Sequence, residues 1–250
     1  MQVDFDLFNN EYIIIKNDIG NVVDKFRFDG EKLEQVKKRK FKNTNVLTPL
    51  DEIQMCAYDM LFRNDILCCC LIGLSGTGKT KTAISVGLEL LKSGVYEKLI
   101  LIRHAEVSGK DIGFLKGTYE DKLINWCGCF YDNLNGEKYE FDELLNKGKI
   151  QIESVAHLKG RNFKNSYVIF DEAEDCLPEQ MEIIGTRQND NCKLVCVGDY
   201  RQVSNRKYLL NNGLLQLINK AKGKNWFGVI ELITNGRGKM AEFFATEYKT

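Results

Sequence analysis

The run Gly-Leu-Ser-Gly-Thr-Gly-Lys-Thr at residues 73–80 constrains the fold of this chain more than any other stretch. It follows an apolar run of strand length at residues 66–72 and precedes residues 83–91, whose apolar side chains recur at helical spacing. A strand, a glycine-rich turn and a helix in this order are the setting of a phosphate-binding P-loop. The simpler alternative is a glycine turn that only connects a buried strand to a helix.

The chemistry of a P-loop assigns a role to each part of this run. Glycines let the backbone curl so that successive N–H groups and the helix N-terminus face a triphosphate. Lys79 would then bring positive charge to the outer phosphates, and the Thr80 hydroxyl would bind Mg²⁺. ATP and Mg²⁺ are therefore the expected cofactors. The residues expected to bind the nucleotide here are Gly73, Leu74, Ser75, Gly76, Thr77, Gly78, Lys79 and Thr80.

Two kinds of pattern alternate along the rest of the sequence. From residue 48 onward, buried strands alternate with helices, which predicts an α/β fold with a doubly wound, mostly parallel sheet. In such sheets, ligands bind beyond the carboxyl ends of the strands. The expected strands are residues 66–72, 98–102, 150–155, 167–170, 193–197 and 229–233, and the expected helices are residues 51–62, 81–92, 119–134 and 178–187.

The first part of the chain has a different pattern. Residues 11–16 and 22–28 look like two strands joined by a turn-rich connection, which predicts a small β-hairpin appendage. Residues 36–42 form a basic run with one aromatic residue, which either holds a phosphate backbone or is a solvated linker. We therefore divide the chain into an appendage with a basic linker at residues 1–45 and a P-loop ATPase domain at residues 46–250.

Two acids follow a fully apolar strand. The strand at residues 167–170 runs directly into Asp171 and Glu172, and it is expected to end at the same sheet edge as the P-loop. Asp171 would hold Mg²⁺, and Glu172 would orient and deprotonate the attacking water. Without the P-loop, an acidic cap on the strand end would be the better interpretation. With it, the acids predict hydrolysis of a nucleoside triphosphate.

Two glutamines are candidates for further contacts with the nucleotide. Gln202 follows the strand at residues 193–197, where an amide can hydrogen-bond a γ-phosphate or the lytic water. Gln54 lies one helix before the P-loop, and a carboxamide can pair with adenine through two hydrogen bonds. The alternatives are an ordinary turn around Gln202 and a surface position for Gln54. The sequence has no Asn-Lys-x-Asp motif, which argues against guanine as the base.

Composition and charge restrict the setting in which this chain works. Its 250 residues suit one large α/β domain with a small appendage. The 35 basic residues balance the 35 acidic ones, so nucleic acid would have to bind a local patch. Nine cysteines without paired Cys-x-x-Cys spacing favour free thiols in a reducing cytoplasm. No apolar run approaches the roughly 20 residues of a membrane span, and the acidic start lacks a signal pattern. We therefore expect a cytoplasmic protein without a membrane partner.

In the order of these motifs the chain resembles the PhoH family of ATPases, whose core is similar to that of superfamily-1 helicases. The likeness is greatest to the PhoH half of PIN-PhoH fusion proteins, and the sequence contains no nuclease half, so RNA cleavage is not implied. The resemblance implies a RecA-like core and ATP hydrolysis in a homo-oligomer, a hexameric ring, with RNA or single-stranded nucleic acid as the substrate. The matching stretches are residues 12–36, 48–54, 73–80, 109–117, 159–161, 171–174, 186–187, 198–202 and 236–237.

The resemblance also assigns single residues. It matches Arg237 to the family's arginine, which would reach the γ-phosphate of a neighbouring subunit as an arginine finger. A solvated loop arginine is the alternative there, and Arg103, Arg161 and Arg187 are rivals for the same role. Glu174 departs from the family pattern, because the family usually has glutamine at this position.

Two other functions remain open. ATP could assemble a nucleotide-dependent oligomeric switch or scaffold in which turnover is incidental, although such a switch has less need of Glu172 as a base. A small-molecule kinase would need an acceptor pocket and an arginine-bearing lid that the sequence does not reveal. The basic run at residues 36–42 and the loop at residues 109–117 are the expected contacts with single-stranded nucleic acid.

Overall fold

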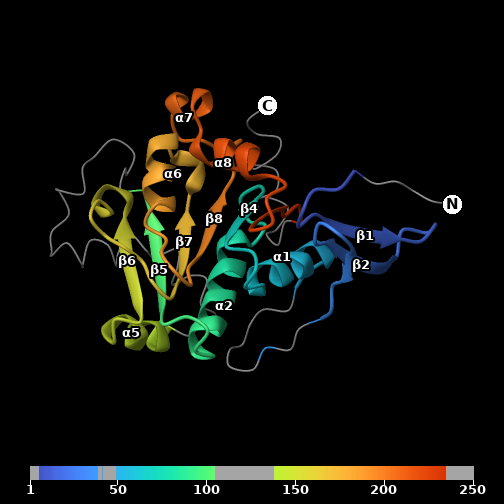
Figure 1. Ribbon diagram of the computed structural model, residues 1–250, viewed down its shortest axis with the longest axis horizontal. Coiled ribbons are helices and arrows are strands. Elements are labelled where there is room, and N and C mark those ends of the chain that lie inside the picture. Colours follow the sequence, from blue (N-terminus) through green and yellow to red (C-terminus); the bar gives the residue numbers. More distant parts are fainter. Residues whose placement is uncertain (1–5, 39–40, 42–48, 105–137, 235–250) are drawn as a thin grey trace.

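The main element of the fold is a parallel β-sheet, seen in a computed structural model that describes residues 6–38, 41, 49–104 and 138–234. Within these residues the sheet has six strands in the order β6-β5-β7-β8-β4-β9 (Figure 1). The strands are β4 (Cys68–Ile72), β5 (Lys98–Arg103), β6 (Ile150–Ser154), β7 (Ser166–Asp171), β8 (Lys193–Gly198) and β9 (Phe227–Glu231). β8 lies between the P-loop strand β4 and the acid-bearing strand β7, which is the order of a RecA-like core.

Helices cover both faces of this sheet (Figure 1). α1, α2 and α5 pack on one face, and α6 and α8 pack on the other. The helices are α1 (Glu52–Phe62), α2 (Lys79–Lys92), α5 (Lys138–Asn146), α6 (Pro178–Gly185), α7 (Arg206–Leu210) and α8 (Gly213–Ala221), with single 3₁₀ turns η2 (Val155–His157) and η3 (Ala173–Asp175).

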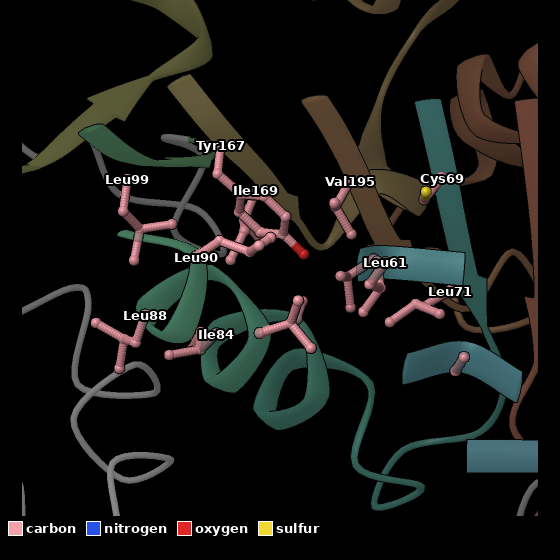
Figure 2. Close-up of a cluster of buried hydrophobic side chains, with 14 of the residues drawn as sticks. Leu61, Cys69, Leu71, Ile84, Leu88, Leu90, Leu99, Tyr167, Ile169 and Val195 are labelled. Carbon is pink, nitrogen blue, oxygen red and sulfur yellow. The ribbon is translucent and has the colours of Figure 1, made fainter. Parts of the chain in front are cut away.

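The alternation of side chains along the strands produces two apolar cores. In β4, Cys69 and Leu71 face α1 and α2, whereas Cys70 faces α6 and α8. Figure 2 shows part of the first core, in which Ile84 of α2 lies below the sheet and Tyr167 of β7 projects toward the helix. Burial on both faces explains why these strands are apolar throughout rather than alternating.

A small antiparallel sheet lies beside α1 (Figure 1). Its strands, in order, are β1 (Tyr12–Lys16), β2 (Val22–Phe28) and β3 (Leu33–Gln35). The sequence predicted a two-stranded hairpin, and the third strand, of 3 residues, was not expected. The Tyr12 hydroxyl donates to Asp59 Oδ2 at 2.9 Å, and Lys25 forms an ion pair with Glu52. These contacts attach the small sheet to α1.

The predicted fold class is confirmed, while several predicted bounds differ from the structure. The sheet is parallel and doubly wound, with an N-terminal β appendage. α2 begins inside the P-loop at Lys79, and β9 begins two residues earlier than the predicted residue 229. The helices α5, α7 and α8 were not expected, and the helix expected at residues 119–134 lies outside the described residues. No helix among those described has the length and apolar character needed to cross a membrane.

Candidate nucleotide site

The P-loop leaves β4 at Ile72 and curls over the start of α2. Gly73, Gly76 and Gly78 have φ angles of 139°, 89° and 83°, which residues with a Cβ rarely adopt. A Cβ at Gly73 would also overlap the carbonyl oxygen of Leu232. Gly78 is the N-cap of α2, and no side chain in the described part of the chain caps this helix. The first backbone N–H groups of α2 can therefore donate to an anion, and a nucleotide phosphate is an anion of this kind.

The Lys79 ammonium folds back onto its own loop. Its Nζ donates to the carbonyl oxygens of Gly73 at 2.6 Å and Leu74 at 2.9 Å. Burial lowers the pKa of Lys79, and nearby carboxylates oppose this shift. These carboxylates, in decreasing order of effect, belong to Glu174, Asp199, Glu172 and Asp171. An arriving phosphate would replace two neutral carbonyls with a charged partner.

Thr80 and Asp171 come together at the carboxyl edge of the sheet. The Thr80 hydroxyl donates to Asp171 Oδ1 at 2.9 Å, although the two residues are 91 positions apart in the chain. Burial raises the pKa of Asp171 to about 6, with a further contribution from the adjacent Glu172, while Arg103 and the Thr80 hydrogen bond act in the opposite direction. A hydroxyl and a carboxylate are the oxygen ligands that Mg²⁺ prefers, so this pair fits the metal that the sequence implies.

Glu172 follows Asp171 in an uncommon backbone conformation. Its φ of 53° and ψ of 43° are left-handed, and it forms the N-cap of η3. The side chain is 48% exposed, and its Oε1 accepts a hydrogen bond from Arg103 Nη2 at 2.9 Å. Arg103 ends β5, and its Nε lies 3.9 Å from Asp171 Oδ2. Glu172, the expected base, is thus paired with Arg103, which the sequence suggested only as an alternative to Arg237 for the role of arginine finger.

Glu174 and Asp199 are two buried acids to which the sequence analysis assigned no role. They are 5% and 3% exposed, and each has one carboxylate oxygen without a hydrogen-bond partner among the described residues. Burial, and then the hydrogen bond and negative charge of Glu172, raise the pKa of Glu174 to about 9. The sequence did contain a signal for these acids, because both closely follow apolar strands that end at the site.

The two glutamine candidates come from different elements, Gln54 from α1 and Gln202 from the turn after β8. The Gln54 side chain is buried, donates to the Thr77 carbonyl oxygen at 3.3 Å and accepts from the backbone N–H of Leu50 at 2.8 Å. It therefore joins the start of α1 to the P-loop. Gln202 follows β8, and its backbone N–H donates to the Asp199 carbonyl oxygen at 2.8 Å. This tight turn holds Gln202 beyond the carboxyl end of β8.

Other expected contacts are distributed around the molecule or fall outside its described part. Lys37 and Lys38 are exposed, and Arg161 pairs with the buried Glu153 at 2.6 Å. Arg237 lies outside the described residues. So do residues 39–40 and 42 of the basic run and the whole loop at residues 109–117.

The fold and the site together define the class of this protein. A RecA-like parallel sheet, a P-loop with its lysine, and an acid pair after β7 make it a P-loop NTPase of the ATPase kind. The sequence profile of the PhoH family, described as "PhoH-like protein", matches residues 46–238. The chain therefore belongs to the PhoH family.

Named relatives share this family. The protein PhoH2 of Bacillus subtilis strain 168 is 31% identical over 249 residues, which is 95% of this chain and 56% of that protein. A PhoH-like protein of the same strain is 34% identical over 164 residues, covering 64% of this chain and 51% of that protein. The chain thus spans about half the length of the curated relatives it matches.

Solved structures with a related arrangement include the Pif1 helicase from Candida albicans. The match has 16% identity and a TM-score of 0.40, and it covers 79% of this chain and 43% of that one. The Hef helicase domain of Pyrococcus furiosus matches with 13% identity and a TM-score of 0.41, over 71% of this chain and 38% of that one. The family assignment rests on the sequence match to the PhoH profile.

Proposed function

We propose that this protein hydrolyses ATP with Mg²⁺ and that turnover is coupled to RNA or another single-stranded nucleic acid. The observation that carries the proposal is the 2.9 Å hydrogen bond between Thr80 and Asp171. It joins the hydroxyl of the P-loop to the carboxylate of β7, the two oxygen ligands that hold the metal in P-loop NTPases.

The site residues divide the work of hydrolysis among them. Lys79 would turn from its own carbonyls to the outer phosphates, and Thr80 and Asp171 would hold Mg²⁺, which neutralises phosphate charge when bound. Glu172 would take the proton from the attacking water as the water oxygen bonds to the γ-phosphorus. The bond from that phosphorus to the bridging oxygen then breaks, and ADP leaves with the displaced electron pair.

The remaining residues would select the nucleotide and report its state. We propose that Gln54 pairs with adenine, since its buried carboxamide is already positioned beside the P-loop. Gln202 would hydrogen-bond the γ-phosphate or the lytic water from the turn after β8.

Arg237 would act on the neighbouring subunit of a homo-oligomer, a hexameric ring by family resemblance. The cysteines in the described part of the chain are free thiols, which agrees with our proposal of a cytoplasmic protein.

The test is a pair of substitutions that separate ATP binding from ATP hydrolysis. Lys79→Ala should abolish ATP binding or turnover, because the outer phosphates lose their cation. Glu172→Gln should keep ATP binding but lower hydrolysis by at least ~100-fold, the scale of general-base catalysis. Phosphate release and nucleotide affinity are measured on the same preparations. Glu179→Gln, an exposed carboxylate on α6, is the matched control and should leave both unchanged. Normal hydrolysis by Glu172→Gln would show that Glu172 is not the base.

Coupling to nucleic acid is measured with the same assay. Single-stranded RNA or DNA should raise the ATPase rate of the wild-type protein, and the stimulation should fall with added salt because phosphate contacts release counterions. An unchanged rate with both nucleic acids would remove this part of the proposal and leave the ATPase itself standing.

A nucleotide-dependent oligomeric switch is the second candidate. The ion pair between Arg103 and Glu172 favours it, because this pair engages the expected base. ATP-dependent assembly with the same slow hydrolysis in wild-type protein and in Glu172→Gln would support the switch.

A further inference from the structure

Arg103 occupies a position that the proposed mechanism leaves unexplained. It is the last residue of β5, and the parallel register pairs it directly with Asp171 at the end of β7. Its side chain is 21% exposed and lies along the carboxyl edge of the sheet, with Nη2 2.9 Å from Glu172 Oε1 and Nε 3.9 Å from Asp171 Oδ2. One guanidinium thus contacts both the expected base and the expected metal ligand.

Glu172 is restrained by these neighbours. Its left-handed backbone is of a kind that costs about 1 kcal/mol or more and that persists only where surrounding contacts enforce it. Its exposed carboxylate accepts a hydrogen bond from Arg103 Nη2 at 2.9 Å. The ion pair holds the Glu172 carboxylate toward the end of β5, which would keep it from turning to a water placed in line with the γ-phosphate.

The charged side chains of the site are therefore all held by contacts within the protein. Lys79 is bound to P-loop carbonyls, Asp171 to the Thr80 hydroxyl, and Glu172 to Arg103. Guanidinium binds carboxylate and phosphate through similar paired hydrogen bonds, and the γ-phosphate of ATP carries more charge than one carboxylate. A triphosphate on the P-loop would bring that group to the edge where Arg103 lies.

We propose that Arg103 is a positioning residue that restrains Glu172 until ATP binds and then exchanges it for the γ-phosphate. The exchange frees Glu172 only when there is a γ-phosphate to attack. ADP lacks this group, so it leaves the Arg103–Glu172 pair in place. The inference rests on the proposed function, because it takes Glu172 as the base of ATP hydrolysis.

The exchange predicts a specific pattern of nucleotide affinities. Arg103→Ala should weaken binding of the β,γ-imido analogue of ATP with Mg²⁺ by about tenfold, the scale of one charge-assisted hydrogen bond, and should leave ADP affinity unchanged. Arg103→Lys should restore part of the loss. Glu172→Gln releases Arg103 from its partner, so it should tighten analogue binding by roughly fivefold, a typical coupling between linked groups. That gain should vanish in the double variant Arg103→Ala, Glu172→Gln.

Calorimetric titration of the analogue and of ADP into the wild type and these variants is the test. Far-ultraviolet circular dichroism checks that each variant is folded, and Lys147→Ala, which removes another carboxylate-paired cation at the exposed end of α5, is the control. The proposal is overturned if Arg103→Ala and Arg103→Lys bind the analogue as the wild type does, if Glu172→Gln gains no affinity, or if its gain survives without Arg103. A wild-type protein that binds neither nucleotide would instead refute the proposed function, so the two failures are distinguishable.

Discussion

Glu174 is a buried carboxyl at the centre of the site. Its side chain fills the space beside Gly198, where a Cβ would overlap Glu174 Oε2. Burial, and then the hydrogen bond and charge of Glu172, raise the pKa of Glu174 to about 9, so we expect this carboxyl to carry a proton at neutral pH and to be able to donate to Glu172. A protonated glutamate is similar to glutamine in shape and hydrogen bonding. A protonated Glu174 would therefore suit a position at which the family resemblance led us to expect glutamine.

This protonation makes stability depend on pH. Between the unfolded pKa of 4.5 and the folded pKa of about 9, the folded state holds a proton that the unfolded state has lost, so Glu174 reduces stability as pH rises. Glu174→Gln removes this effect. The substitution should therefore stabilise the protein at pH 7 by up to about 3 kcal/mol, at about 1.4 kcal/mol for each pH unit above the unfolded pKa.

Urea unfolding at pH 5, 7 and 8.5 measures this effect. The advantage of Glu174→Gln over the wild type should be small at pH 5 and should grow at each step. Glu182→Gln, an exposed position on α6, is the control and should show no such trend. A constant difference at all three pH values would mean that Glu174 is ionised in the folded protein.

At the scale of elements, the small N-terminal sheet depends on one buried side chain. Asn10 is 3% exposed and has a left-handed φ of 64°. Its Nδ2 donates to the carbonyl oxygens of Asn225 and Phe227, both at 2.9 Å, and its Oδ1 accepts from Arg27. The contact joins residues more than 200 positions apart and connects the small sheet to the beginning of β9.

Asn10→Ala should loosen this connection. The substitution leaves two buried carbonyl oxygens without this partner, removes one of the contacts of Arg27 and places alanine in the left-handed region, which asparagine tolerates better, so we expect a loss of about 3 kcal/mol. Thermal unfolding measures the loss, and hydrogen exchange of β1 and β2 locates it. Asn21→Ala in the exposed turn before β2 is the control. Equal protection of both strands in the two variants would show that Asn10 does not hold the sheet.

At the scale of the whole molecule, the proposed homo-oligomer would supply a second arginine, Arg237, to the ATP site. Arg103 is supplied by the same chain as the P-loop, whereas Arg237 is proposed to act across a subunit boundary. If the trans arrangement holds, specific activity should rise with protein concentration as subunits assemble. Mixing Arg237→Ala with Lys79→Ala subunits should restore some turnover, because an intact P-loop in one subunit meets an intact arginine in the next.

Light scattering with ATP provides the size of the assembly during this experiment. The unmixed variants are the controls and should each stay inactive or nearly so at every concentration. A monomer with full specific activity at high dilution would show that the ATP site is complete within one chain.

Local patterns in the sequence predicted the strands that lead into the nucleotide site. They also contained a signal for α8 that our sequence analysis did not use. The apolar run before the P-loop became β4, and the strand before Asp171 became β7. α8 was not predicted, although Asn212 before it has the N-cap chemistry that the structure uses, accepting from the Leu215 N–H at 2.9 Å. Such features depend on residues within one or two helical turns of each other, so the sequence alone can specify them.

Contacts between distant residues were decided only by the tertiary structure. The pairing of Arg103 with Glu172 depends on β5 lying beside β7, an order that no local pattern encodes. The same holds for the buried Lys193, whose ammonium donates to the carbonyl oxygens of Met60 and Arg63 at the end of α1. Periodicity and turn chemistry act over a few residues, whereas burial and charge pairing depend on which strands become neighbours. The sequence therefore determined the P-loop and its strand–turn–helix setting, and the packed sheet determined which charges meet at its edge.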